Sequence, residues 1–178
     1  MILSAAAENR AAVHSATNVL PPLFLPDHGA LVTAGAFSAD GALVATAAQD
    51  ALIRIWPAGG SAAPSALLKG HTQDIQALAF SPKGGALASA ALDGTVRLWN
   101  VSGGDATFTL AHRGAVHALA YSPDGQRLVT GSADGLARIW QVETGDLYAT
   151  LSGHTKAIRA VVFSRDGARL LTTSEDGT

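Results

Sequence analysis

Short hydrophobic segments separated by turn-forming residues run along most of the chain. Segments of four to eight mainly apolar residues alternate with clusters of Gly, Pro, Asp and Ser, a pattern typical of an all-β protein. A first kind of segment reads IQALAFSP, VHALAYSP or IRAVVFSR, a second reads LVATAA, LASAAL, LVTGSA or LLTTSE, and a third reads LIRIW, TVRLW or LARIW. Because these segments are apolar at most positions, we expect strands that are covered on both faces.

A fourth, less apolar segment follows in each cycle, as ALLK, TFTLA or LYATL. A weaker strand of this kind suits the outer edge of a sheet. The tetrapeptides SADG, SPKG, SPDG and SRDG separate the first and second kinds of segment, and each ends in a Gly that can adopt a positive φ. The pattern therefore predicts four-stranded antiparallel sheets in which the fourth strand lies outermost.

Four residue types recur at fixed spacing along these segments. An Asp recurs every 41 to 43 residues, with a His 22 positions before it, a Ser or Thr four before it and a Trp six after it. The four sets are His28, Thr46, Asp50 and Trp56; His71, Ser89, Asp93 and Trp99; His112, Thr130, Asp134 and Trp140; and His154, Thr172 and Asp176. A repeat of this length is that of a propeller blade, not that of a helical solenoid.

The segment LLKGHTQDIQALAFSPKGGALASAALDGTVRLWN resembles a WD repeat of the WD40 β-propeller family, and the segments around His112 and His154 do so too. The resemblance implies a WD40-type propeller with about four repeats of four-stranded antiparallel blades, partial and open unless further sequence or another chain completes it. It also implies a buried hydrogen-bond chain in each set, from the Trp N–H to the Ser or Thr hydroxyl, then to His and to Asp. Such chains fix one strand register, because buried polar groups need partners.

The same spacing divides the chain into repeats. We expect residues 1–27 to end a degenerate blade, residues 28–70, 71–111 and 112–153 to form three repeats, and residues 154–178 to form the first two strands of a fourth. In the first segment, Ser4, Glu8 and His14 take the positions of the Ser or Thr, the Asp and the Trp. An Ala-rich leader without structure is the alternative for these residues.

Two explanations of the open ends remain. The favoured one is that the chain is an internal piece of a longer propeller. The other is that two chains complete each other by self-association through their open blade ends, with residues 157–174 of one pairing with residues 10–25 of the other.

The recurring Ser or Thr, His and Asp could suggest a hydrolytic triad, but an enzyme needs one nucleophile and this set occurs repeatedly. The sequence contains no phosphate-binding Gly-rich loop and no His or Cys spacing typical of a metal site. We therefore expect no catalytic, cofactor-binding or metal-binding residues. Arg54, Arg97 and Arg138 lie four positions after an Asp, and we expect their stems to pack between blades instead of forming an anion-binding ring.

Charge and composition limit the class of partner that the chain can bind and indicate its location. The formal net charge is -2, and the 12 basic residues are scattered without a stripe, which argues against nucleic acid. No run approaches 18 apolar residues, so we expect no membrane-spanning segment. The absence of Cys fits a reducing compartment, and we predict a cytoplasmic location.

The resemblance implies that protein or peptide partners bind the top face, which is formed by the loops that hold each His and each Asp. On that face we single out Leu92, His117 and Arg159 as contacts. The predicted function is a non-catalytic protein–protein interaction scaffold. The alternative is a sensory or regulatory propeller segment of a larger multidomain signalling protein.

Overall fold

The structure is a computed structural model that describes residues 2–6, 9–15 and 21–178. Glu8, which the repeat spacing places at an Asp position, lies outside the described residues. Within the described residues every regular element is a β-strand. The all-β class and the four-stranded antiparallel blades expected from the sequence are confirmed.

Three complete four-stranded sheets follow one another along the chain, and each is an antiparallel meander. We call them blades 1 to 3. Blade 1 consists of β4 (Val32–Phe37), β5 (Leu43–Ala48), β6 (Ile53–Pro57) and β7 (Ala66–Leu68). Blade 2 consists of β8 (Ile75–Phe80), β9 (Ala86–Ala91), β10 (Thr95–Asn100) and β11 (Ala106–Ala111). Blade 3 consists of β12 (Val116–Tyr121), β13 (Arg127–Ser132), β14 (Ala137–Gln141) and β15 (Leu147–Leu151).

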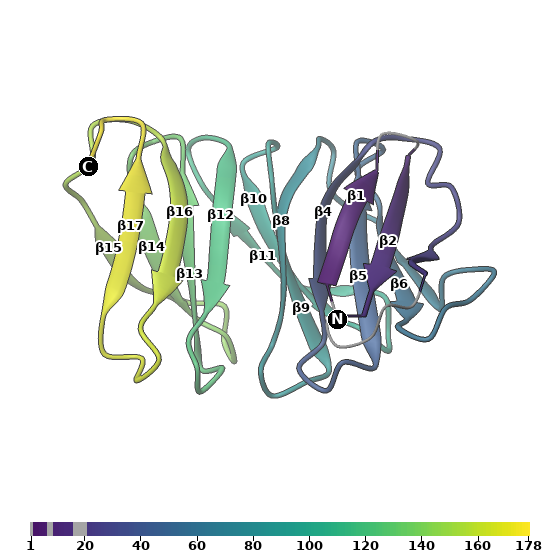
Figure 1. The fold of residues 1–178 in the computed structure, drawn as a ribbon. Coiled ribbons are helices and arrows are strands. Elements are labelled where there is room, and N and C mark those ends of the chain that lie inside the picture. The colour runs from purple at the N-terminus through teal and green to yellow at the C-terminus, as the bar shows by residue number, and fades with distance from the viewer. Residues whose placement is uncertain (1, 7–8, 16–20) are drawn as a thin grey trace.

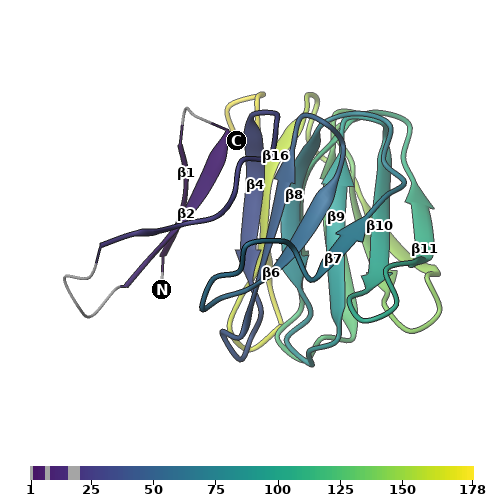
Figure 2. The ribbon, with the colours of Figure 1, turned by 90° about the vertical axis from the view of Figure 1, so that its right-hand side faces the viewer.

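Two smaller sheets flank the three blades. Blade 4 pairs β16 (Ile158–Phe163) with β17 (Leu170–Ser174). The N-terminal sheet has the order β1 (Ile2–Ala6), β2 (Arg10–His14) and β3 (Leu23–Phe24). Its first strand contacts β4, and the sheet leans away from blade 1 in the view of Figure 2.

The first strands of the blades, β4, β8, β12 and β16, lie side by side and form the inner wall of an arc (Figure 1). The N-terminal sheet lies at one end of the arc and blade 4 at the other, so the described residues form an open propeller segment. The loops that lead into the first strands and the turns after the second strands lie at the same edge, which is the upper edge in Figure 1.

The hydrophobic core lies between consecutive sheets. Between blades 1 and 2, for example, Ile53 and Leu68 of blade 1 pack against Leu87 and Trp99 of blade 2. Similar clusters join blades 2 and 3, blades 3 and 4, and the N-terminal sheet and blade 1. The apolar character of both strand faces therefore follows from burial between two neighbours.

The turn between the first and second strands has a local cause. In blade 3, Ser122 Oγ donates to Asp124 Oδ1 at 2.6 Å, and the same carboxylate oxygen accepts the N–H of Gln126 at 3.0 Å. Gly125 completes the turn with φ of 65°, a conformation that costs a Gly little. The SxDG tetrapeptide thus closes the hairpin, which presents each second strand to its neighbour in a fixed register.

Candidate functional site

A three-residue hydrogen-bond chain recurs in each complete blade. The indole N–H of Trp56, Trp99 or Trp140 donates to the hydroxyl of Thr46, Ser89 or Thr130 at 2.8, 2.8 and 3.0 Å. The same hydroxyls lie 2.7, 2.6 and 2.8 Å from Nε2 of His28, His71 and His112. In blade 4, Thr172 Oγ1 lies 2.8 Å from Nε2 of His154. The sequence spacing thus corresponds to side chains that are in contact.

Blade 2 shows how the protons are arranged. Ser89 Oγ accepts the indole N–H, so its own hydroxyl proton is free to donate to Nε2 of His71. Nδ1 of His71 then carries the ring proton and donates to Asp93 Oδ2 at 2.9 Å. A neutral imidazole satisfies this chain, and burial lowers the pKa of His71 although Asp93 opposes the shift.

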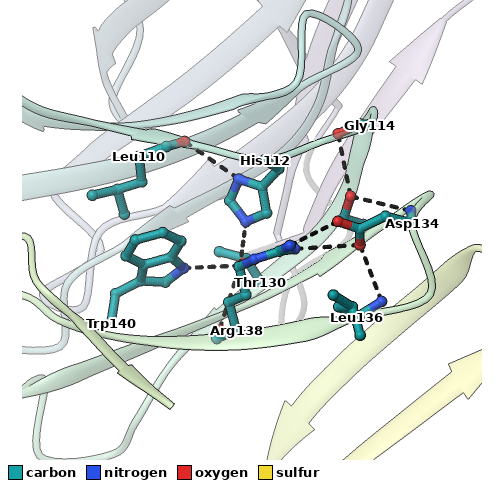
Figure 3. Close-up of polar contacts among 9 residues, drawn as sticks. Leu110, His112, Gly114, Thr130, Asp134, Leu136, Arg138 and Trp140 are labelled. Carbon is teal, nitrogen blue, oxygen red and sulfur yellow. Dashed lines mark hydrogen bonds and ion pairs between the residues drawn. The ribbon is translucent and has the colours of Figure 1, made fainter. Parts of the chain in front are cut away.

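The Asp residues have two different partners. Asp93 and Asp176 bind Nδ1 of His71 and His154, at 2.9 and 3.1 Å. Asp50 and Asp134 instead form ion pairs of 2.7 Å with Arg54 and Arg138. Figure 3 shows the second arrangement, in which His112 contacts Thr130 and the Leu110 carbonyl while Asp134 turns to Arg138. The prediction of a hydrogen bond from His to Asp is therefore wrong for these two sets.

The residue two positions after the Asp accounts for the difference. In blade 2 it is Thr95, whose hydroxyl donates to Asp93 Oδ1 at 2.7 Å and lies 3.2 Å from Nδ1 of His71. Thr178 makes the same two contacts with Asp176 and His154. Leu52 and Leu136 occupy this position in the other two sets, and an aliphatic side chain offers no hydroxyl to hold the carboxylate beside the His.

We expect that in the Thr95→Leu variant the Asp93 carboxylate leaves His71 and forms an ion pair with Arg97. This is the arrangement of the Asp50 and Asp134 sets. The substitution removes the hydroxyl that joins Asp93 to the imidazole, so we expect a loss of about 1 kcal/mol in the free energy of unfolding. NMR of the His71 ring protons, combined with urea unfolding, measures both changes. A His71 Nδ1 proton that stays hydrogen-bonded to the Asp93 carboxylate in the variant would contradict the role of Thr95.

The Arg that lies four positions after each Asp has a different partner according to whether that Asp binds a His. Arg54 and Arg138 are held by Asp50 and Asp134. In blade 2, where Asp93 binds His71, the guanidinium of Arg97 lies 5.8 Å from the centroid of the Trp99 ring. These three heads are thus engaged within their own blades, at carboxylates or at an aromatic face.

Burial sets the charge state of the His residues. Burial is the largest cause that lowers the pKa of His112, and the nearby Arg138 lowers it further, to about 4. For Asp93, burial alone would raise the pKa, but hydrogen bonds from Thr95, Thr72 and His71 outweigh it and hold the pKa below its ordinary value. At neutral pH the network therefore contains a neutral His and a charged Asp.

The hydroxyls at the centre of these networks are unsuited to attack a substrate. Thr46, Ser89 and Thr130 are fully buried, and each hydroxyl is held between an indole and an imidazole. Among the residues that the structure describes, no group of three or more His, Cys, Asp or Glu side chains could hold a metal ion. In the same residues no helix is long and apolar enough to cross a membrane.

The three top-face residues singled out from the sequence have different surroundings. Leu92 and His117 are half-buried and Arg159 is exposed. Arg159 Nε donates to Glu175 Oε1 at 2.8 Å, and after burial Arg159 is the next cause that lowers the pKa of His117. The structure thus brings His117 and Arg159 together across blades 3 and 4.

A second polar contact lies at the same edge. Gln49 Nε2 donates to Asp74 Oδ2 at 3.3 Å, which joins blade 1 to blade 2. The N–H of Leu92 donates to the carbonyl of Asp74 at 2.9 Å. The top face therefore presents mixed polar and apolar side chains on backbone that is fixed by hydrogen bonds.

A family model matches the chain at four places, in agreement with the repeat spacing found in the sequence. The family model described as WD domain, G-beta repeat matches residues 21–57, 63–100, 104–141 and 145–178. Each match begins before the outer strand of one sheet and runs into the next sheet, so that residues 63–100, for instance, contain β7 to β10. No curated protein sequence matches the chain.

Proposed function

Because the chain belongs to the WD40-repeat family, whose repeats generally mediate protein–protein interactions, we propose that it is a non-catalytic scaffold that binds a protein or peptide on its top face. The observation that carries the proposal is that the Ser or Thr hydroxyls of the three complete blades are buried and that each is held by an indole and an imidazole. The groups that could resemble an enzyme's triad are thereby engaged in holding the blades. What remains available to a partner is the surface of a rigid arc.

The proposed binding site consists of four residues of the top face. Arg159 and Glu175 offer an exposed cation and an exposed anion, and His117 and Leu92 add half-buried surface beside the blade ends. A mixed site of this kind suits a folded protein or a peptide better than a polyanion, because the chain as a whole has a net charge of -2. A cytoplasmic location is part of the same proposal.

Site-specific photo-crosslinking tests the proposed face. A photoreactive residue at position 92 or 159 is expected to crosslink to a partner in cell extract. The same residue at position 83, in the turn at the opposite edge, serves as the matched control and is expected to crosslink less by at least fivefold. Equal crosslinking from positions 83 and 92 would contradict a top-face site.

A further inference from the structure

The turn between the first and second strands of blade 2 departs from the repeat. In blades 1, 3 and 4 this turn reads SADG, SPDG and SRDG, and its third residue is Asp40, Asp124 or Asp166. Blade 2 reads SPKG, so Lys83 stands where the other blades have an Asp. A position that breaks a local rule kept elsewhere in the chain is a candidate for a functional role.

The Asp closes the other three turns, whereas blade 2 closes its turn in another way. Each of these Asp carboxylates accepts a Ser hydroxyl at 2.5 to 2.6 Å and the N–H two residues later at 3.0 Å. A Lys ammonium can only donate. Blade 2 instead has two consecutive Gly residues, Gly84 and Gly85, with φ of 78° and 71°, which cost a Gly little. The head of Lys83 is thus not needed for the turn.

Lys83 lines a cleft of about 660 Å³ between blades 2 and 3. The cleft is formed by the turn after β8 in blade 2 and, in blade 3, by the turn after β12 and the residues that end and follow β14. These segments lie at the lower edge in Figure 1, opposite the top face, and both blades are complete. The corresponding clefts between blades 1 and 2 and between blades 3 and 4 have about 270 and 250 Å³. The departure from the repeat therefore coincides with a cleft of the size that ligand sites have.

Two cations of the cleft lining come from different blades. The stem of Lys83 lies across the turn of blade 3, since a Cβ atom at Gly125 would lie 3.2 Å from Lys83 Cγ. Arg127 is the second cation of the lining, and its guanidinium lies 4.2 Å from the centroid of the Tyr148 ring. This cation–π contact holds the Arg127 side chain in place.

Neither cation is neutralised by an ion pair. Lys83 and Arg127 are exposed, and the ion pairs among the described residues involve neither of them. Both are near Asp124, whose pKa is lowered first by the Ser122 hydroxyl and the Gln126 N–H and then by the two cations. Since those two hydrogen bonds already occupy Asp124 Oδ1, both cations stay available to an anion from outside the chain.

We propose that this cleft is a second docking site, which binds an acidic peptide segment of a partner protein. An Asp or Glu carboxylate of the segment lies between Lys83 and Arg127, where it forms charge-assisted hydrogen bonds. Gln126 and Gln141 also line the cleft, and their amides can both donate to and accept from a peptide backbone. Glu143 in the same lining disfavours a continuous polyanion, because like charges repel. The site is separate from the proposed top-face function and does not depend on it.

An NMR titration of the full 178-residue chain tests the proposal. The probe is a synthetic peptide of sequence ADEDA, and the peptide ANQNA has nearly the same shape without the charges. We expect saturable shift changes at the backbone N–H groups of residues 83–85, 125–127 and 141–143 when ADEDA is added. We expect ANQNA to bind at least tenfold more weakly, because it offers no carboxylate to the two cations.

Three protein variants separate the cleft from the rest of the surface. Lys83→Asp restores the SPDG sequence that closes the turn of blade 3, so we expect a melting temperature no lower than that of the wild type. Its charge is reversed, so we expect ADEDA to bind at least tenfold more weakly, and Arg127→Gln should also weaken binding. Arg113→Gln is the matched control, since Arg113 is an exposed cation before β12 at the top edge, and binding should change less than twofold.

Four results would overturn the proposal: no saturable shifts with ADEDA at millimolar concentration, equal affinity for ANQNA, wild-type affinity in Lys83→Asp, or an equal loss in Arg113→Gln. Displacement of ADEDA by the same concentration of inorganic phosphate would also overturn it, because the cleft would then hold any small anion. None of these results bears on the top face. A photoreactive residue at position 83 replaces the Lys83 cation, so that variant remains a control for crosslinking at the top face.

Discussion

Replacing Trp99 with Ala is expected to lower the free energy of unfolding by about 3 to 5 kcal/mol. Trp99 is 1% exposed and packs with Ile53 and Leu68 of the preceding blade, so the substitution opens a cavity between two sheets. It also removes the indole N–H that donates to the buried Ser89 hydroxyl at 2.8 Å. Apolar packing and a buried hydrogen bond are therefore lost at one position.

Urea unfolding followed by far-ultraviolet circular dichroism measures this effect. Leu147→Ala is the surface control, since Leu147 is half exposed, and its effect should stay within about 0.5 kcal/mol. Trp99→Phe retains an aromatic ring but loses the N–H donor, and it should cost about 1 to 2 kcal/mol. If Trp99→Ala costs no more than Leu147→Ala, Trp99 does not hold blades 1 and 2 together.

The strands could be predicted because local pattern and tertiary burial agree in this chain. The segment IQALAFSP contains β8, and LASAAL and TVRLW coincide closely with β9 and β10. These segments are apolar on both faces because a sheet lies on each side of them. The pairing register of β9 and β10 was also predictable. Ser89 pairs with Arg97, and this register brings the Ser89 hydroxyl to the indole N–H of Trp99.

The partner of each Asp could not be predicted from the spacing alone. The choice between His and Arg depends on a hydroxyl two residues after the Asp, as the contacts of Thr95 show. The signal is present in the sequence as Asp-Gly-Thr against Asp-Ala-Leu or Asp-Gly-Leu, but its meaning depends on where the side chain points. The assignment of residues 1–27 to a degenerate blade stays a prediction, although β1 to β3 do form a sheet.

The ends of the arc show the limit of a repeat pattern. Val162 and Leu171 lie directly opposite each other on β16 and β17, at positions whose pattern indicates burial. They are nevertheless 51% and 62% exposed. A hydrophobic pattern indicates which face of a strand a neighbouring sheet can cover, and among the described residues no sheet covers these two side chains.

Lowering the pH from 7.5 towards 4 is expected to destabilise the fold, by about 3 kcal/mol through His112 alone. Burial, with Arg138 as the second cause, lowers the pKa of His112 to about 4 from its ordinary value of 6.5. Between these two values the unfolded chain binds a proton that the folded chain excludes. The free energy of unfolding therefore falls by up to about 1.4 kcal/mol per pH unit for this one group.

The direction of the change follows from the depressed pKa. The full contribution of neutral His112 is present above pH 6.5, and it is lost progressively as the pH falls through the folded pKa of about 4. Burial also lowers the pKa of His28 and His71, so these groups act in the same sense. The pKa of Asp93 is lowered as well, and its contribution is lost at lower pH, as the pH falls through a value below the ordinary one for Asp.

Urea unfolding at pH 7.5, 6.5, 5.5 and 4.5 measures the His112 contribution when wild type is compared with His112→Gln. The Gln amide can still bond to the Thr130 hydroxyl, but it does not titrate. We expect the variant to be less stable at pH 7.5 and to lose less stability between pH 6.5 and 4.5, so that the two curves converge as the pH falls. Parallel curves would show that His112 is not the group that couples protonation to unfolding, because a buried neutral imidazole must produce a difference in slope.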